Sequence, residues 1–531
     1  MSQFKERGQR QLAFLLGVSL LALGATVRAD EALVEQGRRI YQQGIQSDGQ
    51  PLSAVSAGNA SLSAEKAACI SCHRRSGMGN REGAQAVSPI AGPILYARPV
   101  PNFPKRPGRE AKVTPLRRDT RSAYDDSTLI RAVREGLDPD GHQLTSLMPR
   151  YRLGDADAKA LTAYLKQLSA APVPGLQGAK LHLATIVTAD ADPVRSKVVS
   201  ETLTTWARMG GLRGTPMDLQ VWKLDGPAAT WGQQLQEYNR RQPVYAVLSG
   251  AGGAQWAPVR DFCERAALPC LFPIVDLAPS DPDDFYTLYF SRGVPLEAQM
   301  LARHINELTP RPKRVVQIVA GDAGVAAARL LDAELDDLPH ETRPWKSQAP
   351  AGLITDLQPG DVLVAWLGSA DLQQLAKAQA QGPGTEMVFF SGQLAPADKT
   401  DLPLAWRKNA RWVSAHSDPA RLYGKGVIGL TPWAEHMHLP LGERSLMSQI
   451  YAATYYFADA LARMRGSWNR EYLLEALENA NFNRPAGSAY ISLSLAPGQR
   501  EAAKGGHLRR SGVGQSGSAK QTHKAAAVWQ D

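Results

Sequence analysis

The chain has 531 residues and a mass of 57.5 kDa, enough for several compact units at about 150 residues per domain. Hydrophobic residues make up 44% and charged residues 21%, which excludes a disordered chain and a multispanning membrane protein. The net charge is +9, but most of the excess lies near the two ends, so the folded body is close to neutral. Composition therefore gives nucleic-acid binding no support.

Residues 1–29 carry the pattern of an export signal. A basic start precedes the apolar run Leu12–Val27, and small or modest side chains surround the position after Ala29. A transmembrane anchor is the alternative, but the run is shorter than the roughly 20 residues that span a bilayer. We therefore predict a cleaved signal peptide at 1–29, a periplasmic location and no membrane span in the mature protein.

The most specific motif is Cys69-Ile70-Ser71-Cys72-His73. Covalent haem attachment needs two thiols at this spacing, one for each vinyl group, followed directly by a histidine that ligates the iron. A zinc site would need a second pair of ligands, and a thioredoxin-like dithiol would need a βαβ setting; neither accompanies the motif. We predict one haem c, bound covalently through Cys69 and Cys72, with His73 as an axial ligand.

Helical patterns flank this motif. The first covers 31–44 and places Gly37 on the same face as Tyr41. The second covers 154–169 and has one apolar stripe, which we expect to cross the first helix at Gly37. The stripe consists of Ala158, Leu161, Leu165 and Leu168. With the motif between these helices, residues 30–170 resemble a class I cytochrome c, and the resemblance implies an all-α domain that transfers electrons.

The same resemblance implies a methionine followed by proline as the second axial ligand. Met148-Pro149 precedes the last helix, and the proline favours an extended backbone at Met148. Met78 and His142 are the alternatives, but Met78 follows the haem motif closely and His142 belongs to a turn. With both axial positions filled, the iron has no open position for oxygen, so we predict an electron carrier and not an enzyme.

Between these ligands, residues 98–121 carry a net charge of +6 and five prolines. This composition is typical of a surface loop. The charges either neutralise the haem propionates and steer an acidic redox partner, or form a solvated loop with no dedicated partner.

After a predicted linker at 171–178, short apolar runs alternate with helical patterns. This alternation predicts parallel sheets built from βαβ units. A dinucleotide-binding Rossmann domain is the first alternative, because glycines cluster at 249–253. However, the third glycine of that fingerprint is replaced by Gln255, and the cluster follows the third strand instead of the first.

Residues 179–498 resemble the type I periplasmic binding proteins of the leucine/isoleucine/valine group. The resemblance rests on KLHLATIVTAD, on YAVLSGAGGAQWAPVRDFCERAALPCLFPIVD and on MSQIYAATYYFADALARM. It implies a two-lobed α/β clamp whose cleft holds a small ligand at the carboxyl ends of the strands. The candidate ligand-binding residues are Ser249, Gly250, Gly252, Gly253 and Asp276, the first four as an anion site. A tight turn and a helix cap are the alternative roles.

Two further features are read from the second half. Cys263 and Cys270 are close in sequence, and in an oxidising compartment they form either a local disulfide or two buried thiols. Residues 499–531 contain little apolar sequence, so we predict a flexible tail there.

The sequence thus predicts a multidomain chain, with an all-α cytochrome c domain followed by a two-lobed α/β binding-protein domain. The favoured function is electron transfer by an exported cytochrome whose second domain binds a small ligand or docks a redox partner, such as a periplasmic dehydrogenase or another cytochrome. The alternative is a transporter receptor for amino acids or other small solutes, with an accessory or sensing haem.

Overall fold

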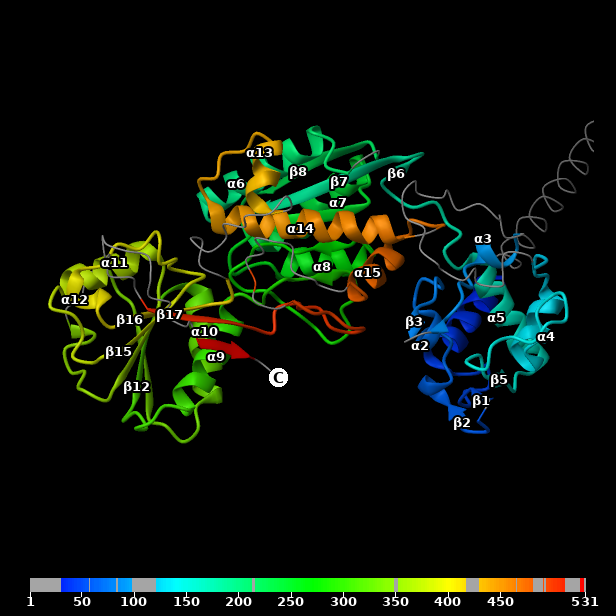
Figure 1. The fold of residues 1–531 in the computed structure, drawn as a ribbon, viewed down its shortest axis with the longest axis horizontal. Coiled ribbons are helices and arrows are strands. Elements are labelled where there is room, and N and C mark those ends of the chain that lie inside the picture. Colours follow the sequence, from blue (N-terminus) through cyan, green and yellow to red (C-terminus); the bar gives the residue numbers. More distant parts are fainter. Residues whose placement is uncertain are drawn as a thin grey trace, which may run out of the picture. The chain divides into compact units, whose positions relative to one another are not determined.

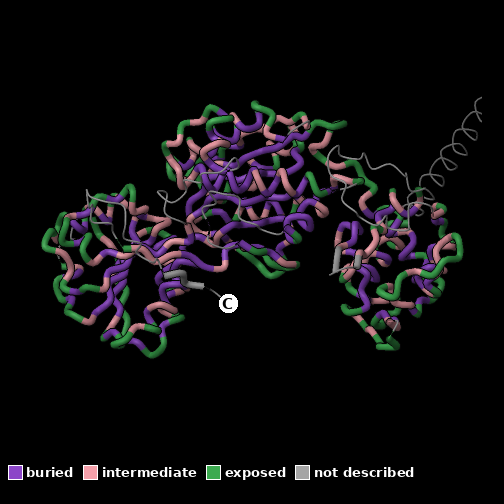
Figure 2. Tube along the Cα trace, in the orientation of Figure 1, coloured by how far each residue is buried: buried purple, intermediate pink, exposed green. Residues whose placement is uncertain are grey.

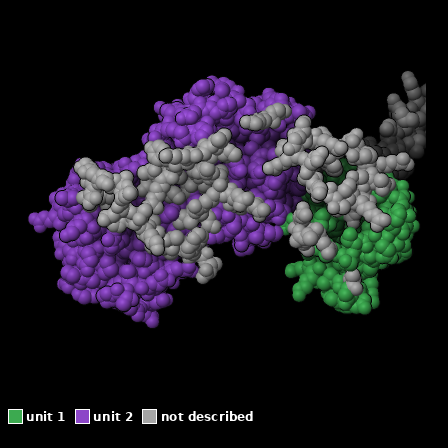
Figure 3. Space-filling model, in the orientation of Figure 1, with its two compact units in different colours: residues 1–172 green, residues 173–531 purple. Residues whose placement is uncertain are grey.

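The computed structural model describes residues 30–56, 58–82, 85–97, 121–212, 215–347, 352–416, 429–464, 466–480, 490, 493–510 and 526–529. The chain forms two compact units, Met1–Pro172 and Val173–Asp531, which we call unit 1 and unit 2 (Figure 3). The predicted signal peptide and residues 98–120 of the basic stretch lie outside the described residues. Among the described residues, no helix combines the length and apolar composition that a membrane crossing needs.

Unit 1 consists mainly of short helices (Figure 1). The described chain begins with a helix over residues 30–43. The later helices are η1 (Ala64–Lys66), α2 (Ile70–His73), α3 (Gly92–Leu95), α4 (Asp126–Glu135) and α5 (Asp155–Gln167). The Asp125 carboxylate caps α4 by accepting a hydrogen bond from the Thr128 amide, and Gly136 ends this helix with a φ of +75°.

Unit 1 also contains two small antiparallel sheets, so the all-α character predicted for this part is not confirmed. One sheet has the order β2-β1-β5, and the other pairs β3 with β4. Their strands are β1 (Ser53–Val55), β2 (Ser61–Ser63), β3 (Arg81–Glu82), β4 (Gln85–Ala86) and β5 (Arg150–Tyr151). Because Tyr151 pairs with Ala54, the segment after Met148 is joined to the segment before Cys69.

The first helix and α5 cross at a glycine, as the sequence predicts. A Cβ atom on Gly37 would lie 2.0 Å from the carbonyl oxygen of Ala160, so no larger residue fits without a shift of the backbone. Beside this crossing, the rings of Tyr41 and Tyr164 lie 5.3 Å apart. The predicted apolar stripe is buried in the core of unit 1, with exposures between 3% and 8% for Ala158, Leu161, Leu165 and Leu168.

The first lobe of unit 2 contains a sheet in the order β8-β7-β9-β10-β11, all parallel, with β6 antiparallel to the start of β7. Its strands are β6 (Leu176–Gln177), β7 (Lys180–Thr188), β8 (Met217–Leu224), β9 (Ala246–Ala251), β10 (Cys270–Leu271) and β11 (Thr287–Leu288). Its helices are α6 (Pro193–Arg208), η2 (Ala228–Thr230), α7 (Trp231–Arg241) and α8 (Ala257–Arg265). The central strand β9 is buried throughout, as expected of a parallel strand covered on both faces.

The second lobe contains a sheet in the order β13-β12-β14-β15-β16-β17-β18. Its strands are β12 (Val315–Val319), β13 (His340–Pro344), β14 (Val362–Trp366), β15 (Met387–Ser391), β16 (Ala410–Ser414), β17 (Gly505–Arg510) and β18 (Ala526–Trp529). Its helices are α9 (Val294–Asn306), α10 (Gly321–Glu334), α11 (Ser369–Ala378) and α12 (Leu404–Arg407). Buried residues follow the central strands of unit 2 (Figure 2). The predicted α/β alternation is therefore present in both lobes.

The chain passes between the lobes more than once. After the second lobe come α13 (Leu430–His436), α14 (Arg444–Arg463) and α15 (Arg470–Glu478). Helix α14 packs against α6 of the first lobe and against α15. The chain then returns to the second lobe as β17, which is antiparallel to β16.

The structure differs from the sequence prediction at both ends of unit 2. Strand β6 forms inside the predicted linker 171–178, and β17 forms inside the predicted flexible tail 499–531. Strand β17 forms because its backbone pairs with β16, although its own sequence has little apolar content. The two strands approach closely at Gly506, where a Cβ atom would lie 2.3 Å from the carbonyl oxygen of Ser414. Residues 511–525 and 530–531 of the predicted tail lie outside the described residues.

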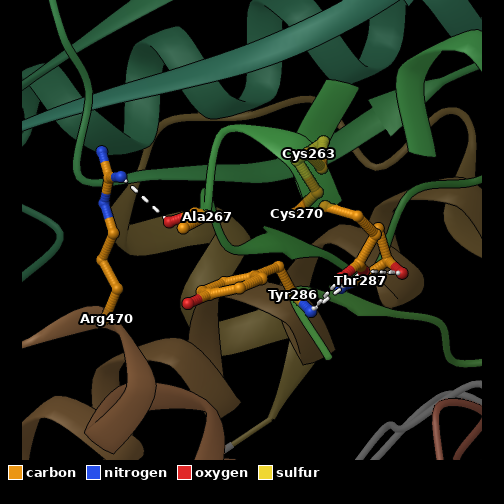
Figure 4. Close-up of a disulfide and its surroundings, with 7 residues drawn as sticks. Cys263, Ala267, Cys270, Tyr286, Thr287 and Arg470 are labelled. Carbon is orange, nitrogen blue, oxygen red and sulfur yellow. Dashed lines mark hydrogen bonds between the residues drawn. A yellow bond between two sulfur atoms is a disulfide. The ribbon is translucent and has the colours of Figure 1, made fainter. Parts of the chain in front are cut away.

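Of the two alternatives for Cys263 and Cys270, the structure contains the disulfide, with an S–S distance of 2.00 Å (Figure 4). It joins the end of α8 to the start of β10. Two further interactions hold the same turn. The Glu264 carboxylate accepts hydrogen bonds from the amides of Tyr286 and Thr287, and the Arg470 guanidinium donates to the Ala267 carbonyl at 3.0 Å.

All eleven tryptophans lie beyond residue 172 and therefore in unit 2. Six of them are less than 2% exposed: Trp206, Trp222, Trp231, Trp256, Trp366 and Trp406. Intrinsic tryptophan fluorescence therefore reports the core of unit 2 and not that of unit 1.

Candidate functional site

Cys69, Cys72 and His73 lie on one helical turn. Cys69 is the N-cap of α2, and the amides of Cys72 and His73 donate to its carbonyl oxygen at 3.3 and 2.9 Å. Residues three and four apart share one face of a helix, so the two thiols and the imidazole lie on the same side. Neither cysteine is in a disulfide. The turn therefore has the geometry that thioether attachment of a haem requires.

The imidazole of His73 is oriented by the backbone. Its Nδ1 atom lies 2.9 Å from the carbonyl oxygen of Ser88, a contact in which Nδ1 carries the proton. Nε2 then keeps its lone pair, and a carbonyl partner of this kind is what fixes a metal-ligating histidine. The side chain is only 8% exposed. His73 thus fits the role of an axial iron ligand.

Cys69 belongs to the apolar core of unit 1, together with Leu95, Tyr151 and Leu161. Burial raises the pKa of the Cys69 thiol to about 12 in the chain without its porphyrin. Such apolar surroundings suit a porphyrin, whose large ring must be removed from water. They suit zinc less well, because zinc binds the deprotonated thiolate, and burial disfavours that form.

Met148 packs against the same core, and its loop is fixed on both sides. The Leu144 amide donates to the Gly136 carbonyl at 2.8 Å, and the Arg150 guanidinium donates to the Met148 carbonyl at 2.5 Å. The alternative ligand His142 is 77% exposed at its side chain and lies 3.3 Å from Asp138. The assignment of Met148 stays a prediction, and these surroundings favour it over His142.

In unit 2, the structure places the predicted anion site at the end of β9. Ser249 has a left-handed φ of +55°, and its buried hydroxyl has no hydrogen-bond partner among the described residues. The amides of Gly253 and Gln255 donate to the carboxylate of Asp190 at 3.3 and 2.9 Å. A Cβ atom on Gly253 would lie 2.6 Å from that carboxylate, which explains the glycine. These amides bind a carboxylate, but it is one of the chain's own.

Asp276 takes part in a bridge between the lobes. Its carboxylate lies 2.7 Å from the Arg195 guanidinium and accepts a hydrogen bond of 2.9 Å from the Gln393 side chain, which follows β15 in the second lobe. A second bridge, of 2.6 Å, joins Lys399 of the second lobe to Glu443, the N-cap of α14. The two lobes are therefore connected by polar side chains at two places.

A cavity of about 520 Å³ lies between these lobes. Asp276 lines it, whereas the predicted residues Ser249, Gly250, Gly252 and Gly253 do not. Several lining residues were not predicted from the sequence, and they are Arg195, Asp371, Gln393, His416 and Glu443. One signal was available: Asp371 follows an apolar strand closely, as Asp276 does.

Comparison with known proteins divides the chain in the same way. Residues 57–169 match the family model of cytochrome c, so this part of the chain is similar to a cytochrome c domain. The predicted resemblance of unit 1 is thereby confirmed over that range. No curated protein matches the sequence.

Unit 2 accounts for the similarity to solved structures. A leucine-binding protein of Thermotoga maritima is 12% identical, with a TM-score of 0.49, and the match covers 66% of this chain and 99% of that chain. The isoleucine complex of a branched-chain amino acid binding protein of Streptococcus pneumoniae gives the same four values. A branched-chain amino acid transporter protein of Thermus thermophilus with bound valine is 12% identical, with a TM-score of 0.48 and coverages of 66% and 96%. These are the relatives that the sequence resemblance predicts for this part of the chain.

Proposed function

We propose that this chain is a periplasmic mono-haem cytochrome c that carries electrons, joined to an α/β unit that binds a small ligand or docks a redox partner. Cys69 and Cys72 hold the haem through thioethers, and His73 and Met148 ligate its iron. The bound haem supplies a one-electron couple. Unit 1 would hold that group in apolar surroundings, and His73 and Met148 would be its ligands.

One observation carries the proposal for unit 1: the two thiols and the oriented imidazole lie on a single turn inside a cytochrome c domain. The Ser88 carbonyl holds the proton of His73 on Nδ1, so Nε2 remains the ligating atom. A thioether ligand opposite an imidazole favours ferrous iron and raises the reduction potential. Electron transfer follows from this ligand set more directly than catalysis.

Location and partners follow from the same proposal. An apolar run behind a basic start supports export, and the disulfide in unit 2 suits an oxidising compartment. An electron carrier in the periplasm exchanges electrons with another protein there, and a dehydrogenase or a second cytochrome fits that role.

The cavity in unit 2 favours a second candidate function, that of a solute receptor in which the haem is an accessory or a sensor. A volume of about 520 Å³ lies within the range of small-molecule sites. A receptor would respond to its ligand in unit 2 whether or not the haem is reduced. Ligand-induced stabilisation that depends on neither the haem nor its redox state would favour this candidate.

Haem attachment is tested by expressing the full chain in a host that matures c-type cytochromes. The purified protein should be coloured, and its pigment should stay with the protein in acidified acetone. The Cys69→Ser/Cys72→Ser double variant should lose the covalent pigment, because no thioether can form. The matched control Cys263→Ala/Cys270→Ala should keep it. A colourless native chain, or pigment that is extracted by acid, would contradict the proposal.

A further inference from the structure

Some charged side chains around the cavity of unit 2 already form hydrogen bonds or ion pairs within the chain, and others do not. Eight charged residues line the cavity, and they are Asp192, Arg195, Asp276, Asp371, Asp398, Lys399, Glu443 and Arg509. Five are acidic and three are basic, so the lining carries a net negative charge. A ligand of matching charge is therefore positive or neutral.

The groups that would bind an anion are engaged within the chain. Arg195 is 9% exposed at its side chain and donates to the Gly252 carbonyl at 2.6 Å and to Asp276 at 2.7 Å. Lys399 lies 2.6 Å from Glu443. The amides at the end of β9 are bonded to Asp190. A ligand carboxylate would have to displace one of these internal carboxylates or a buried backbone contact.

His416 also lines the cavity and adds no positive charge at neutral pH. Burial, with the neighbouring Arg195 and His507, lowers the pKa of its imidazole to about 4. The only basic lining residue outside the two bridges, among those the structure describes, is Arg509 on β17.

Hydrogen-bond acceptors, by contrast, remain available from separate elements. Asp371 lies in the first turn of α11 and is partly buried, and its carboxylate has no partner among the described residues. In the first lobe, Asp276 uses one oxygen for both Arg195 and Gln393, which leaves the second oxygen for a ligand. Apolar side chains that can cover a carbon skeleton complete the lining, and they are Ile274, Leu394, Trp412 and Leu446.

We infer that the cavity takes a small organic cation, such as an alkylamine, and that Asp371 of the second lobe and Asp276 of the first lobe bind it. This inference rests on the proposed ligand-binding role of unit 2 and names the chemistry of that ligand. It also assigns Asp190 a function: by holding the amides of Gly253 and Gln255, it removes the anion site that the glycine sequence would otherwise offer.

Putrescine, isoleucine and succinate are suitable probes, because they present amines alone, an amine with a carboxylate, and carboxylates alone. Each is titrated into the full haem-loaded chain, and thermal unfolding of unit 2 is followed by tryptophan fluorescence. Putrescine should raise the midpoint in a saturable way, and succinate should not. Asp371→Asn should weaken the response to putrescine at least tenfold. The matched control Asp322→Asn, in the first turn of α10 in the same lobe, should leave it unchanged.

Stabilisation by succinate, or by isoleucine without putrescine, would overturn the inference while leaving the ligand-binding role of unit 2 in place. Absence of any response to all three probes would overturn the inference and favour docking of a redox partner as the role of unit 2. An equal response to putrescine in the Asp371→Asn and Asp322→Asn variants would place the amine elsewhere and overturn the assignment of Asp371.

Discussion

The two units build their sites in opposite ways. In unit 1, three of the four proposed haem contacts fall within the five residues Cys69–His73, and one helical turn arranges them. In unit 2, the cavity is lined by residues from Asp192 to Arg509, on both lobes and on α14. A covalently attached cofactor needs a contiguous pattern, whereas a cleft is assembled from distant segments whose side chains also bond to one another. The first kind of site can be recognised in a sequence, and the second cannot.

The largest expected effect comes from removing the proposed sulfur ligand of the iron in unit 1. Met148→Ala should abolish the methionine–iron charge-transfer band and lower the reduction potential, because the iron loses its thioether. The measurement is an absorption spectrum of the oxidised protein, together with a redox titration. His142→Ala, which removes the exposed alternative, should change neither. Carbon monoxide binding to the native ferrous protein would show that the iron already has an open position and would contradict the assignment.

The next largest effect concerns the helix crossing in unit 1. Gly37→Ala should destabilise unit 1 by about 1–3 kcal/mol or more, because the added Cβ meets the Ala160 carbonyl. The loss appears in denaturant unfolding followed by haem absorbance. Gly58→Ala is the matched control, since a Cβ there meets nothing within 4 Å. A change in the tryptophan-reported transition of unit 2 would show that the two cores are coupled.

The disulfide provides the corresponding test of unit 2. Cys263→Ala/Cys270→Ala should lower the free energy of unfolding of unit 2 by about 2–3 kcal/mol, since a short loop is no longer closed in the unfolded chain. Tryptophan fluorescence reports the change, and haem absorbance should stay constant. If reduction of the native disulfide shifts the transition much less than the double variant does, packing of the cysteines and not the cross-link accounts for the loss.

The last prediction is a pH dependence at Glu297. Burial raises the pKa of this carboxyl to about 8, above its usual value near 4.5, although it accepts bonds from the Ser391 hydroxyl and the Gln393 amide. Its contribution to the stability of unit 2 is complete below about pH 4.5 and is lost as the pH rises through about 8. Glu297→Gln should therefore gain stability relative to the native chain across that window. The exposed Glu386→Gln should show a constant difference from pH 4.5 to 8.

How far the sequence could predict the structure depends on how local each feature is. The helix crossing at Gly37 and the turn Cys69–His73 follow from neighbouring residues, and the structure contains both. The three-stranded sheet of unit 1 depends on pairing between Ala54 and Tyr151, which no local pattern encodes. Strand β17 was not predicted for the same reason, because it is held by backbone hydrogen bonds to β16 and not by its own side chains.

The predicted ligand site of unit 2 shows the same limit of prediction from local sequence. In the loop 249–253 that was predicted to bind an anion, the Gly253 amide, together with the Gln255 amide, binds the carboxylate of Asp190. Arg195 and Gln393 gain their importance from contacts with Asp276, and those contacts span many residues of chain. A pattern can show that a loop suits an anion, but it does not show which carboxylate occupies that loop.

The path of the chain through unit 2 also has a consequence for biosynthesis. Unit 1 is contiguous, so its core can close without waiting for the rest of the chain. The first lobe has to wait for α14 and α15, and the second lobe has to wait for β17. Until residue 510 has been made, β16 is an open sheet edge with unpaired N–H and C=O groups, the kind of surface on which nascent chains aggregate. The strand that covers this edge is thus made after every parallel strand of the second lobe.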